Sequence, residues 1–171
     1  MGSGSGGPYS GTNGGSQPYA ATYHVVDKEL AHDKKDPDIY DPQKGYFKNP
    51  TSINIEKSVK DNSIYIAGNK ANGTMTYVLD KNGDIIVGKR FNPNDNSKRS
   101  PHPTLIGGKD PEVQCAGMIT FKSGKIFNYN NESGHYKPNS QSLPKVQAAL
   151  DKLYKSNPLL FHKDSKWRKN K

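Results

Sequence analysis

The chain is almost without cysteine, and this excludes several classes of protein. Cys115 is the only cysteine among 171 residues, so an intramolecular disulfide and a CxxC metal or redox site are both ruled out. Cys115 stands in the apolar run 113–119, a context that favours a buried, unreactive thiol. The motifs of zinc-dependent deaminases and peptidases are missing as well. We therefore expect no metal site and a fold held together by its core alone.

Hydrophobic residues are scarce and form no long runs. They make up 31% of the chain, and the mean hydropathy is −0.94. No apolar stretch approaches the roughly 18 residues of a transmembrane helix, and the N-terminus lacks the apolar centre of a signal peptide. We expect no membrane insertion by this domain. If it is exported, another part of a larger secreted polypeptide must carry the secretion signal.

The composition divides the chain into four parts. Residues 1–17 are a Gly/Ser-rich linker, because such a segment cannot bury enough apolar surface to offset the entropy of ordering. Residues 18–52, with weak periodicity and a short helix over 27–32, are predicted to form an extended segment that wraps the core. Residues 53–160 form the predicted catalytic core, and 161–171 form a basic tail.

A cluster of aspartates stands in the wrapping segment. Its members are Asp33, Asp36, Asp38 and Asp41. The cluster lacks the glycine and the terminal glutamate of an EF-hand loop, so a solvated acidic loop is favoured over a calcium site.

The core predicts an antiparallel sheet of about five or more strands. The runs 74–79 and 84–89 flank the Asn82–Gly83 pair, a strong signal for a β-hairpin. A second hairpin is expected over 113–121 and 125–130, and a further strand over 63–67.

One confident helix follows the sheet. It begins at Ser142, has Pro144 in its first turn and ends before Pro158, and its apolar residues follow a helical spacing. The fold class is therefore α+β, with this C-terminal helix packed on the sheet. Residues 91–111 contain no convincing element and are predicted to be a long loop, of the kind that in a compact domain is either functional or disordered.

Two of the five histidines stand in constrained contexts. His102 lies between two prolines in the long loop, and His135 follows the second hairpin in the string Ser133-Gly134-His135-Tyr136. If the loop folds over the end of the hairpin, the two imidazoles can serve one substrate as base and acid. The rival interpretation is that His135 and Tyr136 merely bond to loop carbonyls. For the remaining histidines, His24, His32 and His162, a structural role is favoured.

The predicted site residues fall into three groups. The catalytic candidates are His135, His102, Tyr136 and Ser133. The candidates for binding a charged substrate are Lys137, Lys109, Arg90 and Lys125. The carboxylates that an ADP-ribosyltransferase would need are sought at Glu112 and Glu132. Ser133 lacks the GxSxG context of a hydrolase nucleophile, which argues against acyl transfer.

Positive charge dominates the chain. Lys and Arg outnumber Asp and Glu by 25 to 16, which gives a net charge of +9 and favours encounter with RNA, DNA or an acidic inhibitor. Several of these lysines stand in the basic tail, where a charge run is more often solvated than part of a groove.

A set of short motifs in residues 75–155 resembles a known module. The motifs are Tyr77-Val78-Leu79-Asp80 with Gly83, His102, Gly107-Gly108, Ala116-Gly117, Gly124, and the string Ser133-Gly134-His135-Tyr136 with Pro138. They resemble a module in the C-terminal regions of bacterial polymorphic toxins of the Rhs and contact-dependent types, and a region of plant IQ-motif calmodulin-binding proteins. Two departures are Pro103-Thr104, where relatives have two serines, and Met118, where many toxins have glutamate. No IQ motif is present, so calmodulin binding is not expected.

The resemblance implies the effector domain of a toxin used in bacterial competition. Such a domain is secreted as part of a larger polypeptide, acts in the cytoplasm of the target cell and is neutralised by an immunity protein, here expected to be acidic. Two histidines on a basic chain favour a metal-independent ribonuclease that needs no cofactor. The alternative is an ADP-ribosyltransferase or NAD glycohydrolase that consumes NAD. A noncatalytic protein-binding module is the third possibility.

Overall fold

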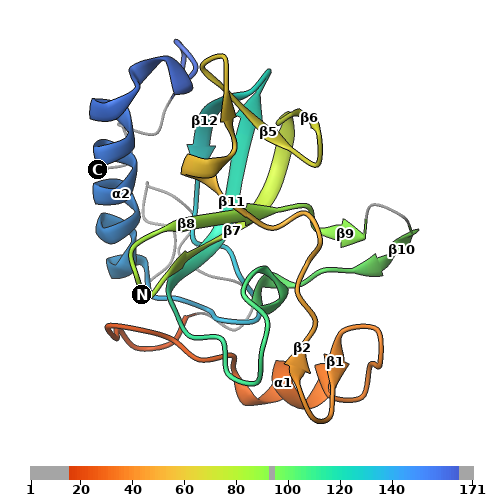
Figure 1. The fold of residues 1–171 in the computed structure, drawn as a ribbon. Helices are drawn as coiled ribbons and strands as arrows, with labels where there is room; N and C mark the ends of the chain where they lie inside the picture. The colour runs from red at the N-terminus through yellow and green to blue at the C-terminus, as the bar shows by residue number, and fades with distance from the viewer. Residues whose placement is uncertain (1–15, 93–94, 166–171) are drawn as a thin grey trace.

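A computed structural model describes residues 16–92 and 95–165 (Figure 1). The protein is an α+β domain built around a five-stranded antiparallel sheet with the strand order β12-β11-β7-β8-β3. The strands of this sheet are β3 (Ile53–Asn54), β7 (Gly73–Asp80), β8 (Ile85–Gly88), β11 (Val113–Lys122) and β12 (Lys125–Tyr129). The predicted fold class is therefore confirmed.

Both predicted hairpins are present. Strands β7 and β8 pair from Thr76 opposite Gly88 to Leu79 opposite Ile85, and the Asn82–Gly83 turn joins them with Gly83 at φ +86°. Strands β11 and β12 pair around the Ser123–Gly124 turn. Strand β11 also pairs with the central strand β7, so β11 is hydrogen-bonded on both edges.

One face of the sheet is covered by helix α2 (Leu143–Ser156), which follows the 3₁₀ turn η3 (Ser140–Ser142). The helix buries Val146, Leu150 and Leu153 against side chains of the sheet such as Tyr77 and Ile119. This confirms the helix expected from the spacing of its apolar residues. Pro158 follows in the 3₁₀ turn η4 (Pro158–Leu160), as its role as a stop predicts.

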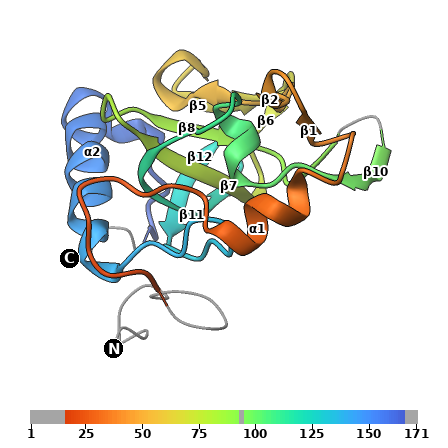
Figure 2. The same ribbon diagram turned by 90° about the horizontal axis from the view of Figure 1, so that it is seen from below.

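The other face is covered by residues that precede the sheet in sequence. Helix α1 (Asp27–Asp33) and the two-stranded ribbon of β1 (Tyr40–Asp41) and β2 (Gly45–Tyr46) form this layer. Tyr23 bridges to Val113 of β11, and a second core of buried side chains lies beneath. The view from below shows α1 and the chain leading to it running along this face (Figure 2). The predicted short helix thus exists and ends one residue later than expected.

Residues 91–111 contain more structure than the sequence predicted. They form a ribbon of β9 (Phe91–Asn92) and β10 (Asp95–Arg99), followed by the 3₁₀ turn η2 (His102–Leu105). The prediction of a loop without secondary structure is wrong. The ribbon is held by backbone pairing, and its mostly polar sequence has no apolar periodicity that would indicate strands. A small three-stranded sheet of β4 (Val59–Lys60), β5 (Ser63–Ile66) and β6 (Asn69–Lys70) follows the 3₁₀ turn η1 (Ile55–Lys57) and completes the domain.

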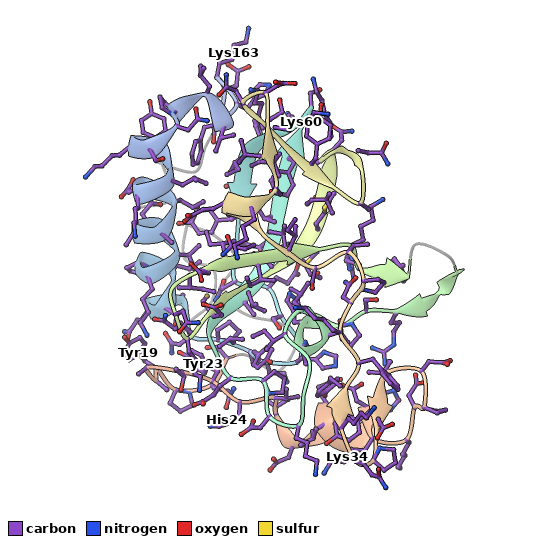
Figure 3. All side chains as sticks on the ribbon, viewed as in Figure 1. Tyr19, Tyr23, His24, Lys34, Lys60 and Lys163 are labelled. Atoms are coloured by element: carbon purple, nitrogen blue, oxygen red, sulfur yellow. The ribbon has the colours of Figure 1, made fainter. Side chains whose placement is uncertain are left out.

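Part of the predicted linker and tail, residues 1–15 and 166–171, lies outside the described residues. Among the helices that are described, none has the length and apolar character needed to cross a bilayer. The lysines are spread over the molecule: Lys60 and Lys163 lie at one end and Lys34 at the other (Figure 3).

The middle of β11 approaches the segment after β12 very closely. A Cβ atom at Gly117 would lie 2.0 Å from the Asn130 carbonyl oxygen and 2.8 Å from the Asn131 Cα. These are backbone atoms, so a side chain at this position forces the two segments apart. The Asn130 carbonyl also accepts a hydrogen bond from the buried Tyr77 hydroxyl at 2.6 Å, which fixes its position.

We predict that Gly117→Ala destabilises the domain by about 3 kcal/mol or more, because backbone must move to admit the methyl group. Urea unfolding followed by circular dichroism measures this loss. Gly134→Ala is the matched control, since nothing lies within 4 Å of its Cβ position, and its stability should stay within about 0.5 kcal/mol of wild type. Similar losses in the two variants would contradict the close approach.

Candidate functional site

A pocket of about 240 Å³ opens where the β9–β10 ribbon, η2 and the loop after β12 meet. His102 and His135 both border it, so the structure brings the two predicted histidines together. The other residues that line it are Thr76, Arg90, Phe91, Arg99, Ser100, Pro101, Met118, Glu132 and Gly134.

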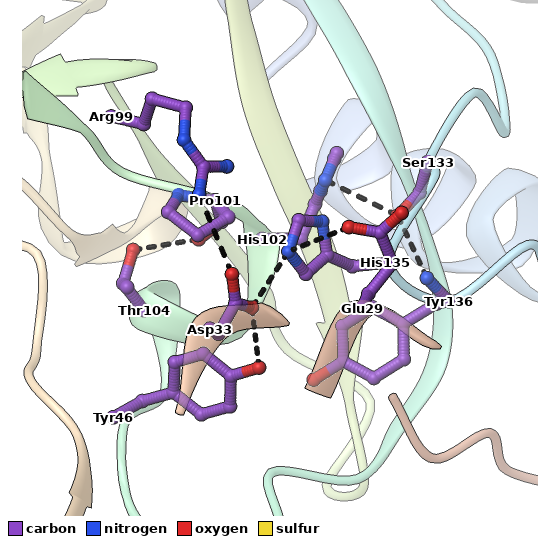
Figure 4. A network of polar contacts seen from close by, with 10 residues as sticks. All are labelled: Glu29, Asp33, Tyr46, Arg99, Pro101, His102, Thr104, Ser133, His135 and Tyr136. Atoms are coloured by element: carbon purple, nitrogen blue, oxygen red, sulfur yellow. Dashed lines mark hydrogen bonds and ion pairs between the residues drawn. The ribbon is translucent and has the colours of Figure 1, made fainter. Parts of the chain in front are cut away.

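His135 is bound through one ring nitrogen to carboxylates of helix α1. Its Nε2 lies 2.8 Å from Asp33 Oδ2 and 3.7 Å from Glu29 Oε1 (Figure 4). An ionised carboxylate only accepts, so Nε2 carries the proton. Within the described part of the chain, no hydrogen bond is formed by Nδ1. The ring therefore has one nitrogen bound to carboxylates and a second nitrogen without a hydrogen-bond partner among the described residues.

Asp33 is completely buried and has three polar partners. Besides His135, the Tyr46 hydroxyl donates to Oδ2 at 2.6 Å, and Arg99 lies 3.4 Å from Oδ1. Burial alone would raise the pKa of this carboxyl, but the hydrogen bonds from His135 and Tyr46 and the charge of Arg99 outweigh it and lower the pKa. Asp33 is thus held as an anion beneath the pocket.

The loop that carries His135 is fixed by its own turn and by the N-terminal segment. Lys137 N–H donates to the Ser133 carbonyl at 2.8 Å, and Lys137 has a positive φ of 42°. Val26 N–H, at the start of α1, donates to the His135 carbonyl at 2.8 Å, while Gln17 N–H donates to the Lys137 carbonyl at 2.7 Å. The imidazole is therefore held from its backbone and from its ring by the same N-terminal layer.

His102 differs from His135, because both of its ring nitrogens have neutral partners inside the protein. Nε2–H donates to the Gly117 carbonyl at 2.8 Å, so Nδ1 is the acceptor for the Ser133 hydroxyl at 3.2 Å. Burial lowers the pKa of His102 to about 4, against the opposing effect of the Gly117 bond. At neutral pH this ring is uncharged and its nitrogens are occupied. The geometry suits a residue that positions its neighbours.

The predicted cationic residues are widely dispersed. Of the four, only Arg90 borders the pocket. Lys109 is exposed near the turn between β1 and β2. Lys137 stabilises the loop through backbone hydrogen bonds. Lys125 Nζ donates to the carbonyl of Leu159 at 2.8 Å and to that of Asn62. The second cation of the pocket is Arg99, which the sequence did not single out.

The two candidate carboxylates also lie in different places on the protein. Glu132 is exposed and borders the pocket, three residues before His135. Glu112 lies elsewhere and accepts a hydrogen bond from the Thr22 hydroxyl at 2.6 Å, with His24 at 3.4 Å and Lys81 at 3.6 Å. Glu132 is therefore the carboxylate that shares a surface with the histidines.

Tyr136 and Ser133 lie beneath the surface. Tyr136 is fully buried and its hydroxyl donates to the Pro111 carbonyl, so it anchors the loop and cannot stack a base or reach a phosphate. Ser133 is 1% exposed, bonds to His102 and accepts from Tyr136 N–H at 3.2 Å. Tyr136, one of the predicted catalytic residues, therefore has a structural position beneath the pocket. Cys115 is buried, and burial raises its pKa to about 12, as expected for an unreactive thiol.

Asp33 and Glu29 are the site residues that the sequence interpretation missed. Asp33 was assigned to a solvated acidic loop, whereas it is buried and bound to His135. One signal was available: Glu29 and Asp33 are four residues apart at the end of a predicted helix, so they lie on one face. Such a pair of carboxylates is suited to hold a cationic side chain.

The arrangement can exchange a proton with a ligand and bind negative charge. His135 offers a ring nitrogen whose partner nitrogen is held by Asp33, and Arg90 and Arg99 offer guanidinium groups at the same pocket. In the described residues no three His, Cys, Asp or Glu side chains converge as metal ligands.

The buried, neutral state of His102 predicts a pH-dependent loss of stability. In the unfolded chain the pKa of His102 is about 6.5, so the ring binds a proton as the pH falls below this value. In the native protein the pKa is about 4, so the ring stays neutral until the pH approaches 4. The free energy of unfolding should therefore decrease over this window by on the order of 3 kcal/mol from this group. Urea unfolding at a series of pH values measures it.

The variant His102→Gln supplies the comparison. It has no titrating group at this position, so its unfolding free energy should fall less between pH 6.5 and pH 4 than that of wild type. Parallel curves for the two proteins would show that His102 is not the group responsible.

In comparisons with protein-family models, curated proteins and solved structures, nothing matches the chain. The likeness to toxin modules therefore consists of the short motifs alone. The argument for function depends on the pocket and its residues.

Proposed function

We propose that the domain is a metal-independent ribonuclease and the effector of a bacterial polymorphic toxin. The observation that carries the proposal is His135, which is held through Nε2 by buried Asp33 and borders a pocket with two arginines. Cleavage of RNA by its own 2′-hydroxyl needs a base, an acid and cationic groups for the phosphate, all of which this pocket contains.

The placement of His102 changes the roles first assigned to the histidine pair. Since both nitrogens of His102 are occupied, the partner of His135 is the exposed Glu132. Glu132 accepts the proton of the 2′-hydroxyl while the 2′-oxygen attacks phosphorus. Protonated His135 gives a proton to the departing 5′-oxygen, and the products are a 2′,3′-cyclic phosphate and a 5′-hydroxyl. Arg90 and Arg99 stabilise the charge on the phosphate oxygens.

An NAD-consuming activity remains the second candidate because of Glu132. An ADP-ribosyltransferase or NAD glycohydrolase needs a carboxylate at the reacting ribose, and Glu132 stands beside His135 at the pocket. The size of the pocket favours RNA, however. At about 240 Å³ it is smaller than the roughly 300–1,000 Å³ that encloses a drug-sized ligand, and it suits a phosphate with its ribose better than a dinucleotide.

The toxin context supplies the proposed partners. The domain would be secreted within a larger polypeptide and act on RNA in the cytoplasm of the target cell. A producing bacterium would need an inhibitor, and the net charge of +9 favours a small acidic immunity protein that covers the pocket.

Purified protein is expected to cut single RNA strands in the presence of a metal chelator and without NAD. His135→Ala should lower kcat/KM by about 10²- to 10⁴-fold, the usual worth of a general acid or base. Asp33→Asn should lower it less, because the imidazole remains but loses the carboxylate that holds its orientation. Glu132→Gln should lower it by a factor similar to that of His135→Ala, because an amide cannot accept the proton of the 2′-hydroxyl.

His32→Ala is the matched control, since His32 is exposed on the same helix as Asp33 and should have no effect on the rate. Circular dichroism establishes that each variant is folded. If intact RNA is recovered while nicotinamide accumulates from added NAD, the ribonuclease proposal is wrong and the second candidate takes its place.

Production of the chain in a bacterial cytosol is expected to arrest growth, and His135→Ala should restore it because the catalytic group is missing. Colony counts after induction measure both results. The same strain tests the inhibitor, since a small acidic protein that covers the pocket should also restore growth. Undiminished toxicity of a folded His135→Ala protein would remove His135 from the mechanism.

A further inference from the structure

Phe91 is a large aromatic residue exposed at the rim of the candidate site. Its side chain is 44% exposed and borders the pocket together with His135. Single exposed hydrophobic residues are ordinary on protein surfaces, so exposure alone carries no argument. Phe47 is equally exposed, at 44%, and does not line the pocket. The position of Phe91 is therefore what calls for an explanation.

Phe91 has one arginine over its ring and another opposite it in the backbone pairing of the ribbon. The Arg90 guanidinium lies 5.8 Å from the ring centroid, and Arg99 is the residue opposite Phe91 in the β9–β10 ribbon. Arg99 is in turn held by the buried Asp33. An aromatic ring that shares a pocket with two arginines is a combination that binds single-stranded nucleic acid, where bases stack on aromatic rings and phosphates contact basic groups.

We infer that the substrate is single-stranded RNA and that a base next to the scissile phosphate stacks on Phe91. This inference rests on the proposed ribonuclease function. The pocket has room for the phosphate and ribose beside His135, so the neighbouring base stays outside, at the rim where Phe91 lies. Strands β9 and β10 extend away from the body of the domain (Figure 1). A base within a duplex has both faces covered by its neighbours, so only an unpaired base can stack there.

The experiment uses the full chain and a short oligonucleotide with one ribonucleotide, so that a single phosphate can be cut. Phe91→Ala should lower kcat/KM about 10- to 100-fold, the range expected for loss of one base–aromatic stack. Phe91→Leu keeps an apolar side chain without a flat ring and should lose nearly as much, whereas Phe91→Trp should retain the rate. Phe47→Ala is the matched control and should cut like wild type.

Removal of the base tests the partner directly. An abasic site on one side of the cut should lower the wild-type rate by a similar factor, and Phe91→Ala should add no further loss on that substrate. When the abasic site is on the opposite side of the cut, the loss caused by the missing base and the loss caused by Phe91→Ala should be independent of each other. A fully paired duplex of the same sequence should be cut more slowly than the single strand.

Two results separate the stacking inference from the ribonuclease proposal. If wild type cuts the oligonucleotide but Phe91→Ala cuts equally well, or if the losses are independent on both abasic substrates, the stacking inference is overturned and the ribonuclease stands. If duplex is cut faster than single strand, the substrate class is wrong. If wild type cuts neither substrate, the proposed function fails and this inference with it.

Discussion

The buried carboxylate of Asp33 is the contact on which the site depends. An ionised group without solvent is costly unless it is paired and hydrogen-bonded, and Asp33 meets this condition only where His135, Tyr46 and Arg99 converge. These residues come from the loop after β12, from β2 and from β10. One carboxylate therefore fixes the relative positions of four segments that are far apart in sequence, and it holds two of the pocket's side chains by their inner ends.

The two histidines of the pocket have opposite electrostatic settings. His135 faces the carboxylates of Asp33 and Glu29, whereas His102 faces a carbonyl and a hydroxyl within the interior. The bond from His102 to Gly117 ties η2 to the centre of β11, at the point where no side chain fits. His102 thus completes the wall of the pocket, while His135 retains a nitrogen for chemistry.

The sequence predicted those parts of the molecule that depend on local signals. The β7–β8 hairpin follows from Asn82–Gly83, and helix α2 follows from its apolar spacing and its prolines. The pairing of Asp33 with His135 joins residues 102 positions apart, so no local pattern reports it. The β9–β10 ribbon was missed for a related reason: backbone pairing between polar residues leaves no periodic apolar signal. Tyr136 was predicted to be a catalytic residue but is buried, because an aromatic residue beside a candidate histidine is equally consistent with a place in the site and with a place in the core.

The positive charge of the chain and the chemistry of the site act over different distances. The net charge of +9 can speed the approach of a polyanion but does not by itself orient a phosphate. Orientation requires cations fixed at the pocket, and Arg99 is fixed because Asp33 binds it from below. The same carboxylate removes part of the local positive charge and holds His135 beside it. Under the proposed ribonuclease function, this buried anion gives up some attraction for substrate in exchange for a defined geometry at the reacting phosphate, which is where differential binding lowers the barrier.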